Sequence, residues 1–185
     1  MTDRIPLPRP GQGADKARMD EILRVDHAGE YAAVLIYRAQ RAVFEAKKGR
    51  EAITQDLAEM QDQEAVHLAR FEKLLNERRV RPTAMTPVWR LAASALGAGT
   101  ALIGEKAAHA CTEAVESVIE QHYADQIAEI GDRDPALAAE LKQFREEELA
   151  HHDHAVEHGS REAPAYRLLS GVIKAGCRAA IKISE

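Results

Sequence analysis

A chain of 185 residues has the length of one domain and can bury one continuous core. Aromatic residues make up only 4% of it, and its abundant Ala, Leu, Glu, Arg and Gln favour helices. The formal net charge of −5, without a basic run among stacking aromatics, argues against a nucleic-acid binder. Cys111 and Cys177 form no CxxC pair, which argues against a zinc knuckle or a rubredoxin-type iron site and favours reduced thiols.

The N-terminal part of the chain predicts a lead-in followed by a helical hairpin. Residues 1–15 are rich in Pro and Gly, lack the apolar core of a signal peptide and are expected to be mobile. Residues 16–185 are expected to form a single helical-bundle domain. Helical periodicity runs over residues 16–46, restarts after Lys48-Gly49, and ends near Arg79 before two X-Pro pairs.

The C-terminal part predicts a second hairpin and a final helix. A third helix is expected from about Val88 to about Gly131, with a kink or interruption through Gly97, Gly99 and Gly104. Asp134-Pro135 has the residues of a helix start, with Asp as N-cap and Pro at the first helical position. That fourth helix should continue to about His158-Gly159, and an amphipathic stretch covers residues 163–183. The sequence therefore predicts an all-α protein.

The two predicted hairpins repeat each other. When Glu30 is set against Glu116, Tyr37 coincides with Tyr123 and Gln40 with Gln126. When Glu64 is set against Glu148, His67 coincides with His151 and Met60 with Phe144. Several matches of this kind indicate an internal duplication, so that each hairpin carries a Glu followed by a Glu-x-x-His motif.

The two Glu-x-x-His motifs occupy core-facing positions. Residues three apart project from one helix face, so each motif can offer two ligands to one cavity. The stripes comprise Leu57, Met60, Glu64, His67 and Phe71 in one helix and Leu141, Phe144, Glu148, His151 and Ala155 in the other. Because a buried carboxylate or imidazole costs on the order of several kcal/mol unless it is paired or bound to metal, these stripes predict a metal site.

The other two bundle helices each add one acid, Glu30 and Glu116, on a stripe that also carries Tyr37 or Tyr123. Counted from the turns, all four acids fall within about one or two helical turns of the same height, at roughly 1.5 Å per residue. Four Glu and two His at mid-bundle form the ligand set of di-iron and di-manganese carboxylate proteins. The alternative is that these are exposed helix acids with two incidental histidines.

Five segments carry a family resemblance: ILRVDHAGEYAA, QDQEAVHL, GEKAAHACTEAVES, FREEELAHHDHA and APAYRLLSGVIKAGCRAAIKIS. Over nearly its whole length the chain resembles the demethoxyubiquinone hydroxylases, a membrane-associated branch of the ferritin-like superfamily. The resemblance implies a four-helix bundle of two duplicated hairpins that binds two iron ions per chain. The implied ligands are Glu30, Glu64, His67, Glu116, Glu148 and His151, with no departure at any of them.

The resemblance also implies an activity. An oxidoreductase of this family is a monooxygenase that adds a hydroxyl group to the vacant ring carbon of demethoxyubiquinol in ubiquinone biosynthesis. It uses O₂ and two electrons, and one oxygen atom leaves as water. The sequence leaves open whether NADH, the quinol itself or a reductase supplies the electrons, and which other proteins of ubiquinone biosynthesis are partners. It also leaves open the isoprenoid length and the oligomeric state.

A polyprenyl quinol lies in the bilayer, so the enzyme needs a surface that contacts lipid. The C-terminal stretch has a basic strip and an opposite apolar face, and no acid between residues 163 and 184. The strip is Arg167, Lys174, Arg178 and Lys182, and the face is Leu169, Val172, Ile173, Gly176, Ala180 and Ile183. This pattern predicts an interfacial helix on anionic lipid. The segment 88–104, too short and too weakly apolar to span a bilayer, is expected to add a second apolar surface.

The resulting expectation is a peripheral membrane protein. It would lie on the cytoplasmic face of the cell membrane in a bacterium, or on the matrix face of the inner mitochondrial membrane in a eukaryote. The alternative for the C-terminal stretch is an ordinary packed helix with a solvated basic edge.

Several polar residues near the six positions have open roles. Glu113, Glu120 and Glu147 are neighbouring acids, His122 is a quinone contact or a group behind the ligands, and Tyr37 and Tyr123 are structural or redox-active. His152, His154 and His158 are expected in solvent or outside the ligand set, and Asp26 and Asp62 are conceivable partners of the ligand imidazoles. Competing functions are a rubrerythrin-like peroxidase, iron storage in a ferritin-like cage, and a scaffold without metal.

Overall fold

The computed structural model describes residues 12–185, and within them it contains six α-helices, one short 3-10 helix and no strand. The elements are α1 (Gln12–Glu45), α2 (Glu51–Arg78), α3 (Thr86–Ile103), α4 (Glu105–Ile130), α5 (Pro135–Glu157), η1 (Ser160–Glu162) and α6 (Tyr166–Ser184). The predicted all-α class is confirmed. The first helix begins at Gln12, within the expected lead-in, whose residues 1–11 lie outside the described range.

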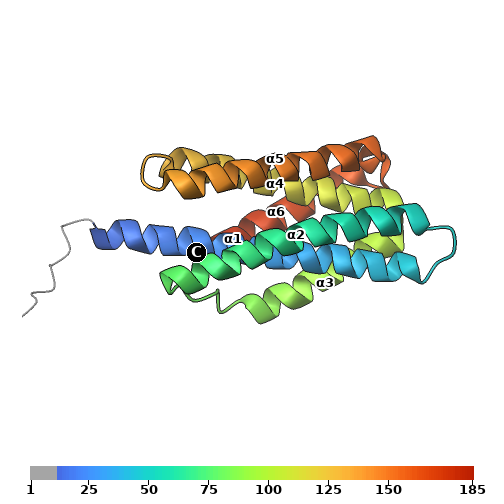
Figure 1. Cartoon of the computed structure of the whole chain (residues 1–185). Helices are drawn as coiled ribbons and strands as arrows, with labels where there is room; N and C mark the ends of the chain where they lie inside the picture. Colours follow the sequence, from blue (N-terminus) through green and yellow to red (C-terminus); the bar gives the residue numbers. More distant parts are fainter. Residues whose placement is uncertain (1–11) are drawn as a thin grey trace, which may run out of the picture.

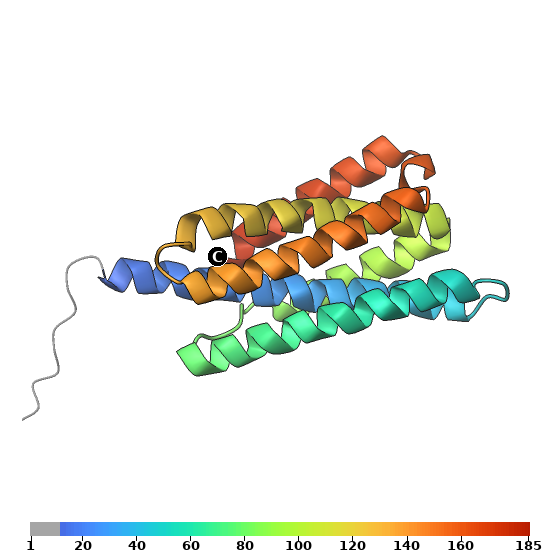
Figure 2. The same ribbon diagram turned by 45° about the horizontal axis from the view of Figure 1, so that its top comes forward.

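Helices α1, α2, α4 and α5 form the expected ferritin-like four-helix bundle (Figures 1 and 2). α1 packs on α2 and α4 packs on α5, so that each predicted hairpin is one half of the bundle. α2 and α5 run side by side where the two halves meet, and side chains bond between them. α3 and α6 lie outside the bundle, against α1 and α4 respectively.

The expected third helix is in fact two helices that meet at Gly104. This glycine has φ 147°, a backbone conformation that residues with a Cβ rarely adopt, so the chain can turn there between α3 and α4. Gly97 and Gly99, which were also candidates for the interruption, lie inside α3. The predicted interruption is therefore confirmed at only one of three glycines.

Gly97 allows α3 to approach α1 closely. A Cβ atom at this position would lie 2.4 Å from the carbonyl oxygen of Ile36 and 3.0 Å from the Cβ of Ala39. The opposite side of α3 exposes Leu91, Leu102 and other apolar residues. The segment expected to be interfacial thus has one packed and one exposed side. In the part of the chain that the structure describes, no helix combines the length and apolarity needed to cross a bilayer.

The start of α5 agrees with the prediction. The Asp134 carboxylate accepts a hydrogen bond of 3.1 Å from the Leu137 backbone N–H, and Pro135 is the first helical residue. This N-cap satisfies a backbone donor that the first helical turn would otherwise leave unpaired.

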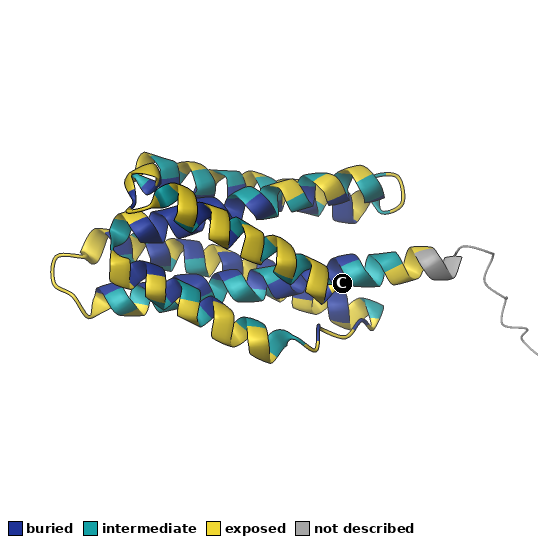
Figure 3. Cartoon of the chain, turned by 180° about the vertical axis from the view of Figure 1, so that it is seen from behind, coloured by how far each residue is buried: buried dark blue, intermediate teal, exposed yellow. Residues whose placement is uncertain are grey.

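Helix α6 packs along α4 and also contacts α1. The apolar face predicted for it is divided. Ile173 is buried and Leu169 and Cys177 are partly buried against α4, whereas Val172 and Ile183 remain 63% and 56% exposed. Near its end, Ser184 accepts a 2.9 Å hydrogen bond from the Trp89 indole, which joins α6 to α3. The outer sides of both helices are largely exposed (Figure 3).

Candidate metal centre

Four helices bring the six predicted ligand residues together at mid-bundle. Glu30 comes from α1, Glu64 and His67 from α2, Glu116 from α4, and Glu148 and His151 from α5. All six are buried, none more than 4% exposed. The alternative that these are exposed helix acids with incidental histidines is therefore wrong.

The six side chains form two overlapping groups that could each hold a metal ion. One group contains Glu30, Glu64, His67 and Glu148, the other Glu64, Glu116, Glu148 and His151, and the donor atoms in each lie within 4.8 Å of one another. Glu64 and Glu148 belong to both groups. Each group therefore has one acid and one histidine of its own, and two acids are shared.

The helical stripes explain why these residues meet. The apolar members of both predicted stripes are buried, including Leu57 and Phe71 on α2 and Leu141 and Phe144 on α5. The ring of His67 packs 4.1 Å from that of Phe144, centroid to centroid. Residues at three- and four-residue spacing share one helix face, so burial of the apolar residues carries the Glu and His side chains into the core.

Both histidines present the same ring nitrogen to the centre. The Nδ1 atom of His67 lies 3.2 Å from a Glu148 oxygen, and that of His151 lies 3.1 Å from a Glu64 oxygen. The Nε2 atoms point away, toward Glu147 Oε2 and Gln63 Oε1, each at 2.5 Å. Because a hydrogen bond to Nε2 fixes the ring, Nδ1 is the nitrogen available for a metal.

Several donor atoms at the centre have no hydrogen-bond partner. They are Nδ1 of both histidines, both carboxylate oxygens of Glu148 and Oε1 of Glu64, all shielded from solvent. A buried polar atom left unpaired costs about 1–3 kcal/mol, so five such atoms facing one another require compensation. Carboxylate oxygen and imidazole nitrogen are the donors found in di-iron carboxylate sites, so the residues present fit divalent iron.

The pKa values show how the centre accommodates its charge without metal. Burial, together with the charges of Glu64 and Glu148, raises the pKa of both Glu30 and Glu116 well above the usual range. Burial also acts on Glu64, but the adjacent His151 and His67 outweigh it and lower the pKa to about 2. The metal-free centre therefore favours protonated carboxyl groups at Glu30 and Glu116, whose protons a bound metal would replace.

The histidines shift in the opposite sense from ordinary buried imidazoles. Burial alone lowers the pKa, but the surrounding carboxylates outweigh it and raise the pKa of His151 to about 10 and that of His67 further. Both imidazoles thus hold protons that a metal would release.

Two tyrosines connect the halves of the centre. The Tyr123 hydroxyl of α4 donates to Glu30 of α1, and the Tyr37 hydroxyl of α1 donates to Glu116 of α4. Burial, followed by the charge of the adjacent carboxylate, raises the pKa of both phenols well above the ordinary value. Each tyrosine therefore remains a neutral donor that orients the acid of the other hairpin.

The outer partners of the histidines differ from those expected. Asp26 instead accepts hydrogen bonds from Gln126 and His122, and Asp62 is exposed, so neither bonds His67 or His151. The actual partners are Glu147 and Gln63. The repeat contains the signal that finds them, since each directly precedes the glutamate of a Glu-x-x-His motif.

The remaining neighbouring acids have structural contacts. Glu113 is buried and accepts hydrogen bonds from Ser160, Arg161 and Tyr166, which fastens the connection between α5 and α6 to α4. Glu120 pairs with Arg145 of α5 at 3.0 Å. Neither acid belongs to the two metal-binding groups.

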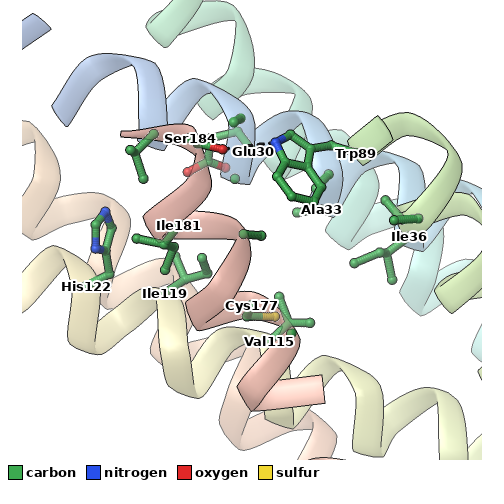
Figure 4. A pocket seen from close by; sticks show the side chains of 18 of the residues that line it. Glu30, Ala33, Ile36, Trp89, Val115, Ile119, His122, Cys177, Ile181 and Ser184 are labelled. Carbon is green, nitrogen blue, oxygen red and sulfur yellow. Dashed lines mark hydrogen bonds between the residues drawn. The ribbon is translucent and has the colours of Figure 1, made fainter. Parts of the chain in front are cut away.

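A cavity of about 400 Å³ between α1, α3, α4 and α6 reaches one side of the centre (Figure 4). Glu30 and Tyr123 line it, whereas Glu116 does not. Its walls are mostly apolar and include Ala33, Ile36, Val115, Ile119 and Ile181; the polar groups of Asp26, His122, Trp89 and Ser184 also line it. The cavity depends on how α3 and α6 close over the bundle.

Comparison with known proteins agrees with this architecture. The ubiquinone biosynthesis protein COQ7 family matches residues 17–184. A 3-demethoxyubiquinol 3-hydroxylase of Rhodospirillum rubrum is 49% identical over 176 residues, covering 95% of this chain and 82% of the relative. The mitochondrial NADPH-dependent 3-demethoxyubiquinone 3-hydroxylase of Mus musculus is 49% identical, covering 92% of this chain and 79% of its own length.

A more distant relative is also a hydroxylase of demethoxyubiquinone. The mitochondrial 5-demethoxyubiquinone hydroxylase of Saccharomyces cerevisiae is 40% identical over 187 aligned residues, covering 93% of this chain and 79% of the relative. The similarity extends over the bundle, the metal-binding groups and α6. This chain belongs to the COQ7 family of ubiquinone biosynthesis proteins.

Proposed function

We propose that this protein is a di-iron monooxygenase that hydroxylates the ring of demethoxyubiquinol. The observation that carries the proposal is the set of buried, unpaired carboxylate and imidazole atoms at the centre of the bundle. The names of the relatives supply the substrate and the type of reaction. The fold alone would be compatible with other di-iron chemistry.

The two groups of residues divide the metal ions between them. Glu30 and His67 would bind one iron, Glu116 and His151 the other, and Glu64 and Glu148 both. Four ionised carboxylates carry four negative charges, which two divalent ions neutralise. When bound, the iron pair supplies the activation of O₂ that a protein side chain cannot provide.

The cavity beside Glu30 suits the ring and the first isoprenoid units of a quinol. Its apolar walls would accept the substrate and exclude water, while Tyr123 holds the Glu30 carboxylate in place. His122 and Asp26 provide polar contacts for ring oxygens. In the overall reaction one oxygen atom enters the ring C–H bond as a hydroxyl group, and the other becomes water with two electrons and two protons.

Two electrons per turnover must come from outside the protein. The mouse relative is named as NADPH-dependent, so a reduced nicotinamide is the donor class that we propose. One NADH or NADPH should then be oxidised for each ring hydroxylated. An unchanged nicotinamide alongside product would point instead to the quinol or to a reductase.

A single turnover tests the reaction itself. Protein loaded with two equivalents of Fe(II) and demethoxyubiquinol is chemically reduced, exposed to ¹⁸O₂, and its quinone is analysed by mass spectrometry. A product that has gained one labelled oxygen atom is expected, and Glu148→Ala should give none. Unchanged quinone with iron still bound would favour the peroxidase or iron-storage function.

We further propose that the protein docks peripherally on the membrane whose bilayer holds its substrate. The outer sides of α3 and α6, next to the cavity, expose Leu91, Val172 and Ile183. Arg167, Arg178 and Lys182 are exposed on α6, where they can contact anionic headgroups. Apolar anchors beside cationic residues fit the interface of an anionic membrane.

Vesicle binding tests this surface with a matched control. Leu91→Glu combined with Val172→Glu should weaken sedimentation with anionic vesicles by more than about tenfold. The control variant is Val66→Glu, because Val66 lies on α2 and is similarly exposed, at 66%. This variant should bind the vesicles as the unmodified protein does. Equal vesicle binding by both variants and the unmodified protein would contradict the proposed docking surface.

A further inference from the structure

A second cluster of metal-ligating side chains lies at the end of the bundle where α1 turns into α2 and α5 leads into η1. It comprises Asp56 of α2, His109 of α4, and His154 and His158 at the end of α5. None of these residues belongs to the two groups at mid-bundle. His154 and His158 were expected in solvent or outside the ligand set, and His158 is indeed exposed and His154 partly exposed, but their rings also stack on each other at 3.9 Å between centroids.

The donor atoms of three of these residues are already close together. Asp56, His154 and His158 can each present one donor atom so that all three lie within 4.8 Å of one another. The Nε2 atom of His154 is 3.4 Å from Asp56 Oδ2. This nitrogen is shielded from solvent and has no hydrogen-bond partner in the described part of the chain. This shielded nitrogen therefore lacks the hydrogen-bond partner that a buried polar atom normally has.

The orientation of His158 also suits a metal ligand. Its Nδ1 is 2.8 Å from the backbone carbonyl oxygen of His154, and a carbonyl can only accept, so Nδ1 carries the proton. Nε2 is then the lone-pair nitrogen. A histidine that donates one ring N–H to a carbonyl while the other nitrogen binds metal is the usual arrangement in metalloproteins.

His109 completes the cluster from the inner side. It is 6% exposed, and its ring lies 5.3 Å from that of His158 and 6.0 Å from that of His154, centroid to centroid. Three imidazoles this close cannot all be protonated without mutual repulsion. Lys106, which lies beside Gly159, is paired with Glu162, so its positive charge is offset.

The position of the cluster indicates what a bound ion would do. Toward the other end of the bundle, α2 is tied to α5 by Arg70–Glu140 at 2.8 Å and by Arg78 to the N-cap Asp134 at 2.6 Å. The end of the bundle that holds the cluster has fewer such links. Beyond the Gln63–His151 hydrogen bond, the described residues contain one polar contact between α2 and α5 at this end, that of Asp56 with His154. A metal ion bound by both α2 and α5 would connect the two helices at this end, as the direct ion pairs do toward the other end.

We propose that Asp56, His154 and His158 bind one divalent transition-metal ion of the zinc type, beside the ring of His109. Two imidazoles with one carboxylate make a donor set that Zn²⁺ accepts readily. His154 lies three residues beyond His151, about 4.5 Å further along α5 at 1.5 Å per residue. The site shares no ligand residue with the centre at mid-bundle.

Metal counting tests the site on the full chain. The protein is loaded anaerobically with Fe(II), exposed to excess Zn²⁺, desalted, and analysed for both metals by mass spectrometry. We expect one zinc per chain with no loss of iron. The double variant His154→Ala/His158→Ala should retain its iron and bind no zinc, and Asp56→Ala should bind zinc at least about tenfold more weakly.

The neighbouring histidine supplies a matched control. His152 is on the same helix, but it pairs with Asp153 on the surface, so His152→Ala should still bind one zinc. Circular dichroism checks that each variant folds. The proposal is overturned if zinc enters only as iron leaves, or if the double variant binds as much zinc as the unmodified protein. X-ray absorption at the zinc edge should show imidazole ligands, and their absence would also contradict the site.

Discussion

The two halves of the metal centre resemble each other closely but are not equivalent. Each half combines an acid from one helix with a Glu-x-x-His motif from the next. In each half, a tyrosine of the opposite hairpin donates a hydrogen bond to that acid. However, His67 is held by the carboxylate of Glu147, whereas His151 is held by the amide oxygen of Gln63. The cavity also reaches Glu30 and not Glu116.

This difference indicates how two similar hairpins can form a site that is open to a cavity on one side only. The repeated stripes place two similar donor sets in the core, so both halves can bind metal. The helices outside the repeat, α3 and α6, then form the cavity on one half only. We propose that both halves bind metal, whereas only the half that contains Glu30 contacts the substrate.

Removal of a shared acid should have the largest effect, because it disturbs both halves at once. Glu148→Ala should weaken the binding of both metals by more than about 100-fold, beyond the 10–100-fold typical of an outer partner. Glu116→Ala should chiefly affect its own half. Iron per chain after desalting measures both. Two irons retained by Glu148→Ala would show that Glu148 is not shared.

Raising the pH should destabilise the metal-free protein. A histidine whose pKa is raised by folding contributes stability below its unfolded value of about 6.5 and loses it as the pH rises through the folded value. For His151 that window runs from about 6.5 to about 10. His67 has a still higher pKa and keeps its proton across the window.

The free energy of unfolding of the metal-free protein should therefore fall by on the order of a few kcal/mol over this range. Urea unfolding at several pH values measures it. In metal-loaded protein the ligand histidines hold no proton at the bound nitrogen, so this dependence should be weaker. Equal slopes with and without iron would argue against His151 as a ligand.

The outer partners of the histidines should distinguish the two halves. Glu147→Ala should weaken metal binding about 10–100-fold, because a carboxylate partner both orients the imidazole and raises its basicity. Gln63→Ala should have the smaller effect, because a neutral amide mainly orients the ring. Competitive titration with a chelator of known affinity measures both. The reverse order would contradict the proposed difference between the halves.

The tyrosines should give the smallest but most selective effects. Tyr37→Phe and Tyr123→Phe each remove a donor from a buried carboxylate, and each should cost about 1–3 kcal/mol of stability in the metal-free protein. Only Tyr123 lines the cavity, so only Tyr123→Phe should also raise KM for the quinol. Similar KM changes in both variants would show that the substrate does not approach the Glu30 half preferentially.

Much of the bundle could be predicted because its information is local. Helical spacing fixed which residues share a face, and the repeat selected Glu116 and Glu148 from among neighbouring acids such as Glu113 and Glu147. Gly104 showed the limit of such reasoning, since three glycines carried the same local signal and only packing decides which one adopts a positive φ.

The rest depends on how helices are rotated against one another. Asp26 and Asp62 had suitable chemistry, but the rotation of α2 and α5 brings Glu147 and Gln63 to the histidines instead. The amphipathic pattern of α6 could not show that Ile173 would be buried and Val172 exposed. Likewise, the cavity and the cluster around His154 come from separate segments, and no single segment contains a signal for either.

The most direct measurement is a crystal structure of the iron-loaded protein with anomalous differences collected on both sides of the iron absorption edge. We expect two iron peaks at mid-bundle, one beside Glu30 and His67 and one beside Glu116 and His151, with Glu64 and Glu148 contacting both. A single peak, or iron bound elsewhere while these six side chains remain without metal, would contradict this expectation.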